Sequence, residues 1–201
     1  MLTAADGTGA WRRYVVTGVN SGRLTLRASA PVRAEPELVP RIGLAVALTK
    51  GGIDNVVARA TDLGVARVEP VRTRRSVVRW DAARAASAVA RLRAIAREAA
   101  AQSRRARLPE IVPVGDLADL VGRSGLVIAD RAGVPAHALP APGPEGWTVV
   151  VGPEGGFDPA DLEPFPDSVP RLAVGPYVLR AETAPPAVVA ALRGRTDGRI
   201  V

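Results

Sequence analysis

Two short stretches of the chain combine a Gly-Pro turn with residues suited to ligand binding. The first, VVVGPEGGF at residues 149–157, breaks a run of valines with Glu154 and two glycines. The second, LAVGPYVLRAETA at residues 172–184, ends an apolar run in Gly-Pro and then carries Arg180 and Glu182. The first stretch holds no nucleophile, so it predicts a binding loop for a small organic group. Its alternative is a structural turn between a strand and a helix.

The backbone of the first stretch suggests how such a loop works. Residues 149–151 end a buried strand, and in open α/β sheets ligands bind just beyond such carboxyl ends. Pro153 fixes the direction of the turn, while Gly155 and Gly156 let backbone approach a ligand closely. If both Gly-Pro stretches follow strands on the same side of one sheet, they form the walls of one pocket.

Several other kinds of chemistry are excluded by composition. The chain has no cysteine, so disulfides, thiolate zinc sites and cysteine nucleophiles are absent. His137 is the only histidine, which rules out a histidine metal cluster, and the phosphate-loop motif GxxxxGK[ST] does not occur. No apolar run reaches the roughly 18 residues that span a bilayer, and the first residues lack the regions of a signal peptide. We therefore expect a cytoplasmic protein with neither a metal nor a membrane partner.

The charge of the chain favours a polyanionic partner. The 27 basic residues exceed the 20 acidic ones, for a net charge of +7, and Lys50 is the only lysine. A basic surface attracts nucleic acid, so we expect arginines on a long helix and in the VRTRRS segment to meet phosphates. The alternative is a solvated, merely polar face. The candidate RNA-binding residues are Arg72, Arg74, Arg75, Arg93, Arg97, Arg104 and Arg105.

Hydrophobic periodicity predicts the elements that position these residues. Strands alternate with helices from Arg41 onward, which indicates an α/β fold with a largely parallel sheet. Gly64 is placed to end the first helix, and Asp81 to cap the second. Strands are expected at 42–48, 66–71, 125–130, 148–152 and 171–175, and helices at 53–63, 81–103, 159–163 and 182–193.

The N-terminal part has a different character. Residues 11–28 read as two strands joined by a turn, and residues 29–40 as a Pro-rich linker. This is too little β-structure to close a stable sheet alone. We therefore divide the chain into an incomplete β-domain with its linker at 1–40 and an α/β domain at 41–201.

Four motifs in order along the chain resemble one known family. VVVGPEGGF and VGPYVLRAETA closely resemble the paired signatures of the SPOUT methyltransferases that modify uridine N3 in bacterial small-subunit ribosomal RNA. Upstream, KGGIDNVVARATDLGV and AREAAAQSRRARLPEI are similar to two further family segments. Asp62 departs from the pattern, since the family usually has glutamate at this position.

The resemblance implies a fold, a cofactor and partners. The fold would be the SPOUT fold, whose sheet is closed by a C-terminal trefoil knot, preceded here by part of a PUA-like RNA-binding β-domain. The cofactor would be S-adenosylmethionine, the substrate 16S rRNA in the small ribosomal subunit, and the assembly a homodimer. By resemblance, the cofactor contacts fall on Gly152, Pro153, Glu154, Gly155, Gly156, Leu172, Val174, Val178, Leu179, Arg180, Ala181 and Thr183.

Catalytic roles follow from the chemistry of methylating uracil N3. Loss of the N3 proton leaves negative charge on the base, which a nearby arginine stabilises, and Arg180 is our candidate. Glu182 is the candidate to accept the proton or orient the base. Alternatively, Glu182 caps its helix and Arg180 pairs with it. Two rival functions also remain: a non-catalytic RNA-binding protein of this fold, and a methyltransferase acting on another rRNA or tRNA base.

Overall fold

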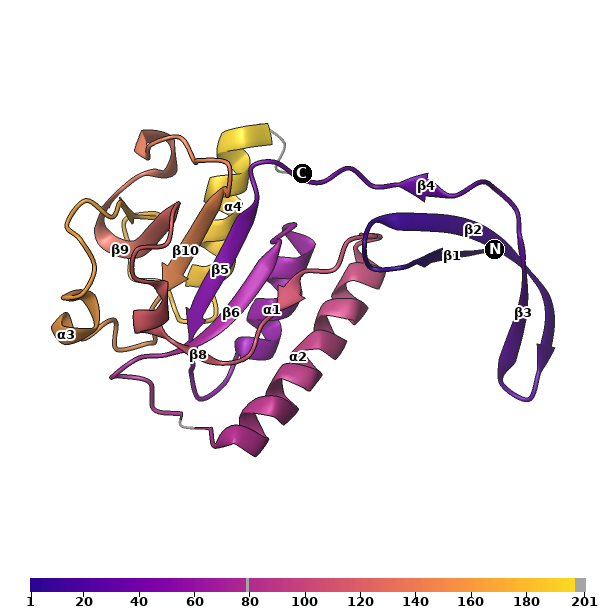
Figure 1. Ribbon diagram of the computed structural model, residues 1–201, viewed down its shortest axis with the longest axis horizontal. Helices are drawn as coiled ribbons and strands as arrows, with labels where there is room; N and C mark the ends of the chain where they lie inside the picture. Colours follow the sequence, from indigo (N-terminus) through magenta and orange to yellow (C-terminus); the bar gives the residue numbers. More distant parts are fainter. Residues whose placement is uncertain (79, 198–201) are drawn as a thin grey trace.

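Two β-sheets lie in two lobes of the molecule (Figure 1). The computed structural model describes residues 1–78 and 80–197. A small antiparallel sheet occupies the N-terminal lobe, and a seven-stranded parallel sheet with helices packed against it forms the large lobe. The small lobe extends away from the large one (Figure 1). Helices described over these residues are too short or too polar to cross a membrane.

The small sheet is built around its longest strand, β2 (Ala10–Asn20). It pairs antiparallel with β1 (Leu2–Ala5), β3 (Arg23–Ala28) and β4 (Arg33–Ala34). The two strands predicted within residues 11–28 are thus confirmed. The expected linker differs from prediction, since it contributes β4 as an edge strand.

The large sheet is parallel throughout, as the alternation of strands and helices predicted. Its order is β11-β9-β10-β5-β6-β7, with β8 also pairing with β6. Because all these strands are parallel, their carboxyl ends meet at one edge. The short β7 and β8 were not predicted, and β11 is shorter than the expected 171–175. The strands are β5 (Ile42–Ala47), β6 (Arg67–Arg72), β7 (Glu110–Ile111), β8 (Gly115–Asp116), β9 (Leu126–Val134), β10 (Trp147–Val151) and β11 (Arg171–Leu172).

The helices agree with the predicted ones in place, with one difference that concerns the site. Asp81 caps α2 by accepting a hydrogen bond from the Arg84 amide at 2.8 Å, and Gly64 follows α1 with φ 78°. The last helix begins at Ala184, so Glu182 lies in the turn before it and not in the helix. The helices are α1 (Ile53–Asp62), α2 (Ala82–Gln102), α3 (Pro159–Leu162) and α4 (Ala184–Asp197), with 3-10 turns η1 (Leu117–Leu120) and η2 (Ala136–Ala138).

Buried side chains cover both faces of the large sheet. On one face, Ile42, Leu44 and Val46 of β5 pack with α1, α2 and α4 in the larger of two hydrophobic clusters. On the other, Ala45 and Val150 belong to a smaller cluster with Leu120 of η1 and with Phe165. Burial on both faces explains why β5 is a continuous apolar run. This packing holds the strand ends, and the loops that follow them, in fixed positions.

The segment that follows α2 joins the two lobes. Arg107 donates to the backbone carbonyl of Thr8 at 2.6 Å and to that of Glu35 at 3.0 Å. The Leu108 amide donates to the Gly7 carbonyl at 2.9 Å. The contact between the lobes therefore includes several hydrogen bonds to backbone carbonyls beside the strands of the small sheet.

Candidate functional site

A cavity of about 240 Å³ lies at the carboxyl edge of the large sheet. Its walls come from three parts of the chain: residues 129–131 within β9, residues 151–154, 156 and 157 at the end of β10 and just after it, and residues of the segment 172–188, which runs from β11 into α4. The prediction that the two Gly-Pro stretches form the walls of one pocket is therefore confirmed. The cavity lies where ligands bind in open α/β sheets.

The first loop makes a tight turn with one open backbone position. The Gly156 amide donates to the Pro153 carbonyl at 2.9 Å, and Gly156 has φ 68°, a conformation that favours glycine. A Cβ added there would meet nothing within 4 Å, so the backbone faces open space. At Gly152 a Cβ would lie 3.2 Å from the ring of Phe157. Gly156 thus presents bare backbone to the cavity, while Gly152 makes room for the phenyl ring.

The second loop supplies apolar walls. Leu172 is buried at the base of the cavity, whereas Val178 is 76% exposed along its rim. Gly175 has φ 71° with open space beyond its Cα. The chain then folds back, with the Thr183 amide donating to the Arg180 carbonyl at 2.8 Å. This turn ends the loop and starts α4.

Most of the residues predicted to contact a cofactor lie around this cavity. Gly155, Arg180 and Thr183 do not line it: Gly155 accepts a hydrogen bond outside it, Arg180 lines a neighbouring hollow, and Thr183 lies in the turn before α4. The roles of all twelve as ligand contacts stay predictions. The nine that line it are Gly152, Pro153, Glu154, Gly156, Leu172, Val174, Val178, Leu179 and Ala181.

The neighbouring hollow, of about 560 Å³, holds the two candidate catalytic residues. Arg180 and Glu182 line it together with Gly51, Gly52 and Glu154. A Cβ on Gly52 would lie 3.2 Å from Cβ of Glu182 and 3.6 Å from its Oε2. Because Gly52 is the N-cap of α1, the Glu182 carboxylate lies at the positive end of that helix.

The side chains of Arg180 and Glu182 are not engaged with the rest of the protein. Within residues 1–78 and 80–197, no hydrogen bond or ion pair joins either side chain to another residue, nor the two to each other. Both are exposed. The helix-capping and internal ion-pair alternatives are thus not the arrangement in this structure, and the two charges face the hollow.

Comparison with known proteins identifies the family. Residues 36–193 match a family described as RNA methyltransferase domain. The chain belongs to this family. The ribosomal RNA small subunit methyltransferase E of Mycobacterium bovis is 33% identical over 195 residues, which cover 91% of this chain and 74% of that protein. The protein of the same name from Bacillus subtilis is 30% identical over 176 residues, covering 80% and 68%.

A solved structure gives the same family relationship in three dimensions. A ribosomal RNA small subunit methyltransferase E from Neisseria gonorrhoeae, bound to S-adenosyl methionine, superposes with a TM-score of 0.87 at 25% identity. The superposition covers 96% of this chain and 82% of that chain. It therefore includes the small lobe as well as the RNA methyltransferase domain.

The methyltransferase domain also contains a pocket residue that the sequence analysis missed. Asp130 lines the cavity, accepts a hydrogen bond from the Ala132 amide at 2.9 Å and forms an ion pair with Arg171. The hydrogen bond from Ala132, followed by the contact with Arg171, lowers the pKa of Asp130, so this wall carries a negative charge. The available signal was the aspartate that ends the strand GLVIAD. No group of three or more acidic or histidine side chains among the described residues forms a metal site.

Some of the predicted RNA-binding arginines of the methyltransferase domain contact the protein itself. Arg93 donates to the Ile111 carbonyl at 2.9 and 3.2 Å. Arg105 donates to the carbonyls of Thr61 at 2.9 Å and Val65 at 2.7 Å, and burial lowers its pKa. Both guanidinium groups therefore direct these N–H donors toward the protein and away from solvent.

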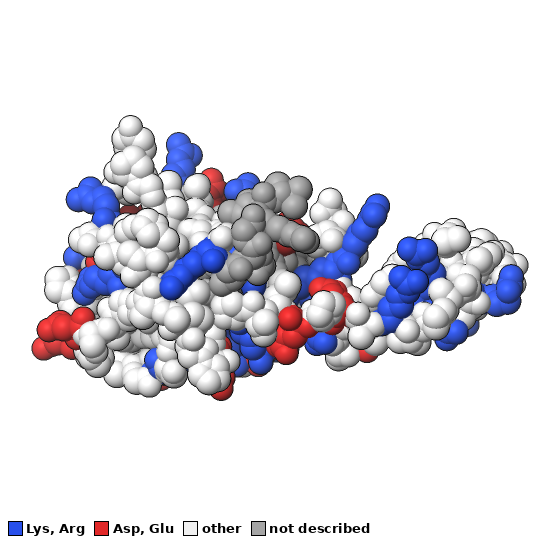
Figure 2. Space-filling view, turned by 90° about the horizontal axis from the view of Figure 1, so that it is seen from above, with Lys and Arg blue, Asp and Glu red and all other residues white. Residues whose placement is uncertain are grey.

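Of the other five predicted arginines, Arg74 has a largely exposed side chain with Nε 3.9 Å from Asp161, and the remaining four fall into two groups. Arg72 forms a two-point ion pair with Asp116, at 2.7 and 2.9 Å, and Arg75 contacts the GPEGG loop. The side chains of Arg97 and Arg104 are exposed and make no hydrogen bond or ion pair with the rest of the described chain. Basic side chains also lie on the small lobe (Figure 2), where residues 1–34 hold five arginines and a single acidic residue, Asp6.

Proposed function

We propose that this chain transfers a methyl group from S-adenosylmethionine to N3 of a uridine in 16S rRNA of the small ribosomal subunit. The family, the names of the relatives and the S-adenosyl methionine in the Neisseria gonorrhoeae structure support this proposal. The observation that carries it is the contact between two hollows. Glu154 and residues 178, 179 and 181 line both the cavity and the hollow with Arg180 and Glu182.

The cavity has the chemical character that this cofactor requires. S-adenosylmethionine combines a flat adenine, a ribose and a positively charged sulfonium. Leu172, Val174 and Val178 offer apolar surface, while the carboxylates of Asp130 and Glu154 complement positive charge. We propose that backbone of the two Gly-Pro loops holds the cofactor.

The chain's own residues handle the proton and the charge on the base. When bound, the cofactor supplies the methyl group from its sulfonium. Glu182 accepts the N3 proton of the uracil, and Arg180 stabilises the negative charge that develops on N3 and the flanking carbonyl oxygens. Since neither side chain is engaged within the described chain, both are available to a base in the hollow. The remaining task of the site is to orient the base for in-line displacement.

RNA binding is assigned to basic side chains of both lobes. Arg97 and Arg104 on the large lobe would meet phosphates together with arginines of the small lobe. We propose that the small lobe is part of a PUA-like RNA-binding domain, that the C-terminal segment is threaded as a trefoil knot, and that the protein acts as a homodimer in the cytoplasm, where ribosomal subunits are found.

The proposal is tested by incubation of the protein with labelled S-adenosylmethionine and 30S subunits, followed by mapping of the modified nucleotide. We expect label on N3 of one uridine of 16S rRNA. Glu182→Gln should keep cofactor affinity within a few-fold and lower the methylation rate by about 100-fold. That loss should shrink as pH rises toward the pKa of uracil, because hydroxide then removes the proton.

Three results would contradict parts of the proposal. Label on another base would retain the enzyme but change its substrate. RNA binding without any cofactor binding would leave an RNA-binding protein of this fold. A Gln variant with parental turnover near neutral pH would remove Glu182 as the proton acceptor.

A further inference from the structure

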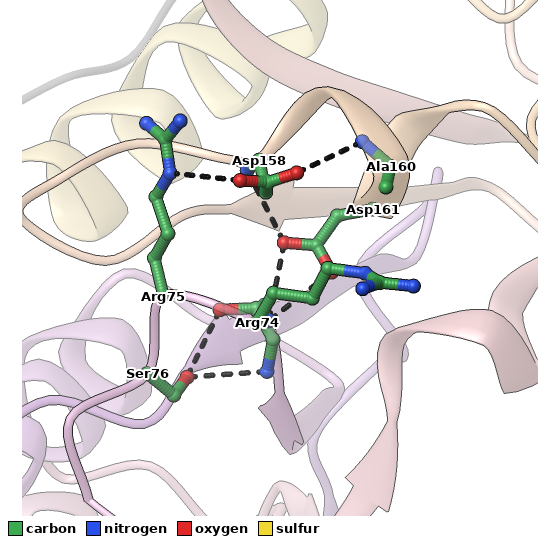
Figure 3. A network of polar contacts seen from close by, with 7 residues as sticks. Arg74, Arg75, Ser76, Asp158, Ala160 and Asp161 are labelled. Atoms are coloured by element: carbon green, nitrogen blue, oxygen red, sulfur yellow. Dashed lines mark hydrogen bonds and ion pairs between the residues drawn. The ribbon is translucent and has the colours of Figure 1, made fainter.

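A short turn after β6 contacts the GPEGG loop and the start of α3, and Figure 3 shows its contacts with Asp158 and Asp161. Within the turn, Ser76 Oγ lies 3.1 Å from the Thr73 amide and 3.0 Å from Thr73 Oγ1. The Ser76 amide donates to the Thr73 carbonyl at 3.1 Å, and Ser76 is buried. These bonds hold the turn in one conformation, and the two arginines between Thr73 and Ser76 are carried by it.

Arg75 extends from this turn to the loop that follows β10. Its Nη1 donates to the Gly155 carbonyl at 2.8 Å, and its Nε lies 3.4 Å from Oδ2 of Asp158 (Figure 3). Asp158 in turn caps α3, because its Oδ1 accepts a hydrogen bond from the Ala160 amide at 3.1 Å. One guanidinium thus links the centre of the Gly-Gly turn to the start of the helix behind it.

A second connection runs beside the first through a buried carboxylate. The side chain of Asp161 is only 8% exposed. Its oxygens accept hydrogen bonds from the Arg74 amide at 3.1 and 3.2 Å and from the Asp158 amide at 3.2 Å. This connection uses the Arg74 backbone, and the Arg74 guanidinium stays largely exposed, with Nε 3.9 Å from Asp161.

We infer that Arg75 is a positioning residue for the cofactor loop. This inference rests on the proposed function, because it assigns a role within the same site. Residues 152, 153, 154 and 156 line the cavity, but Gly155 and Gly156 carry no side chain that would fix the turn. The restraint comes from Arg75, which binds the Gly155 carbonyl from outside the cavity. A hydrogen bond from a charged donor is stronger than one from a neutral donor.

The inference separates two neighbouring arginines that the sequence treats alike. Arg75 uses its guanidinium on the GPEGG loop and on Asp158, so its role differs from the phosphate contact predicted for it. Arg74 directs its guanidinium to solvent and retains that prediction. The two side chains should therefore affect different ligands.

Arg75→Ala, Arg75→Lys and the matched control Arg74→Ala test the inference in the full chain. Titration with S-adenosylmethionine should show affinity about tenfold weaker for Arg75→Ala and unchanged for Arg74→Ala, which keeps the backbone bond to Asp161. Arg75→Lys should recover part of the loss, since an ammonium can donate to one of the two acceptors. In RNA titrations, log K falls as log salt rises, and only Arg74→Ala should make this slope less steep, by about one unit.

Hydrogen exchange supplies a readout that needs no cofactor. The Gly156 amide is bonded to the Pro153 carbonyl, so its exchange reports the closed turn. Exchange at residues 152–158 should rise in Arg75→Ala and stay at the wild-type rate in Arg74→Ala. Absence of cofactor binding by the wild type would contradict the proposed function. The exchange measurement would still show whether Arg75 restrains the loop. Unchanged exchange, or unchanged cofactor affinity with a lowered salt slope in Arg75→Ala, would overturn the inference.

Discussion

The two sheets of this protein differ most in what surrounds them. Every residue of β5, at the centre of the large sheet, is buried, whereas every residue of β1 is exposed. Both hydrophobic clusters belong to the large lobe, and neither includes a residue of the small sheet. The large sheet is held by packing on both faces, and the small one chiefly by its strand pairing and by its hydrogen bonds to the segment after α2.

This difference corresponds to two functional requirements. Positioning of reacting atoms demands fixed backbone, and the cavity lies on loops that leave well-packed strands. Attraction of RNA phosphates demands accessible positive charge and tolerates less order. Variants in the large lobe should therefore alter cofactor binding and stability, and variants in the small lobe chiefly RNA binding.

The largest expected contrast is in stability. Leu44→Ala removes a side chain with no exposed surface and should lower the free energy of unfolding by about 2–5 kcal/mol. Leu24→Ala, at a leucine 51% exposed on β3, should change it by less than about 0.5 kcal/mol. Urea denaturation of both variants measures the difference. Equal losses would mean that the small sheet is covered as well as the large one.

The next contrast uses two glycines with similar backbone conformations. Gly156 has φ 68° in the GPEGG loop, and Gly22 has φ 76° in the β2–β3 turn, each with no neighbour within 4 Å of an added Cβ. Valine at either position should strain the backbone by about 1–3 kcal/mol. Only Gly156→Val should also weaken S-adenosylmethionine binding, by about 100-fold or more, because the side chain displaces and fills the loop. Gly155→Val should do less, because its Cβ would make only an ordinary contact, 3.8 Å from Arg75.

If Gly156→Val and Gly22→Val weaken S-adenosylmethionine binding equally in calorimetric titration, the cavity does not hold the cofactor. If neither does, the loop assignment fails.

A smaller effect should separate the arginines of the large lobe by their contacts. Replacement of the exposed Arg97 and Arg104 by alanine should make the negative slope of log K for RNA against log salt less steep by about two units. Replacement of Arg93 should leave that slope unchanged and lower the melting temperature, since its guanidinium binds the Ile111 carbonyl. RNA titrations at several salt concentrations measure the slope. An unaltered slope in the double variant would mean that this face is merely solvated.

The smallest effect should come from an exposed ion pair at the rim of the large sheet. The hydrogen bond from Arg72 lowers the pKa of Asp116. The stabilisation is therefore complete above the ordinary Asp pKa of about 3.9 and is lost as pH falls through the lowered folded-state value. Because both side chains are substantially exposed, the pair should contribute less than about 1 kcal/mol. Thermal melts of Arg72→Ala between neutral and acidic pH should show the difference from wild type disappearing in acid. A constant difference at every pH would assign the loss to packing of the arginine stem.

The sequence predicted the large lobe better than the small one, for a physical reason. Strands buried on both faces leave continuous apolar runs such as residues 42–48, and caps such as Asp81 mark helix starts locally. The strand β4 was missed because a two-residue edge strand depends on its partner β2, which is distant in sequence. Local patterns carry no information about such pairing.

The motifs of the candidate site could be predicted from the sequence, whereas the contacts between its residues could not. The Gly-Pro turns and the charges of Arg180 and Glu182 could be read directly, and the structure brings them to adjoining hollows. Asp130 was overlooked because it lies on a strand with no motif of its own. The different contacts of Arg74 and Arg75 could not be predicted, since they are made with Asp158 and Asp161, more than 80 positions away.

The length of the helix α2 sets the spacing between the turn after β6 and the small lobe. The helix begins at Ala82, after the turn that contacts the GPEGG loop, and ends at Gln102, on the side of the small sheet (Figure 1). Arg107, in the segment that follows, donates to the Thr8 carbonyl. The 21 residues of α2 span about 30 Å, with a rise of about 1.5 Å and a rotation of about 100° per residue. Each residue inserted into it or removed would swing the basic lobe around the helix axis more than it would lengthen the molecule. Under the proposed function, the residue count of α2 therefore sets the direction from which RNA bound to the small lobe reaches the cavity at the carboxyl edge of the large sheet.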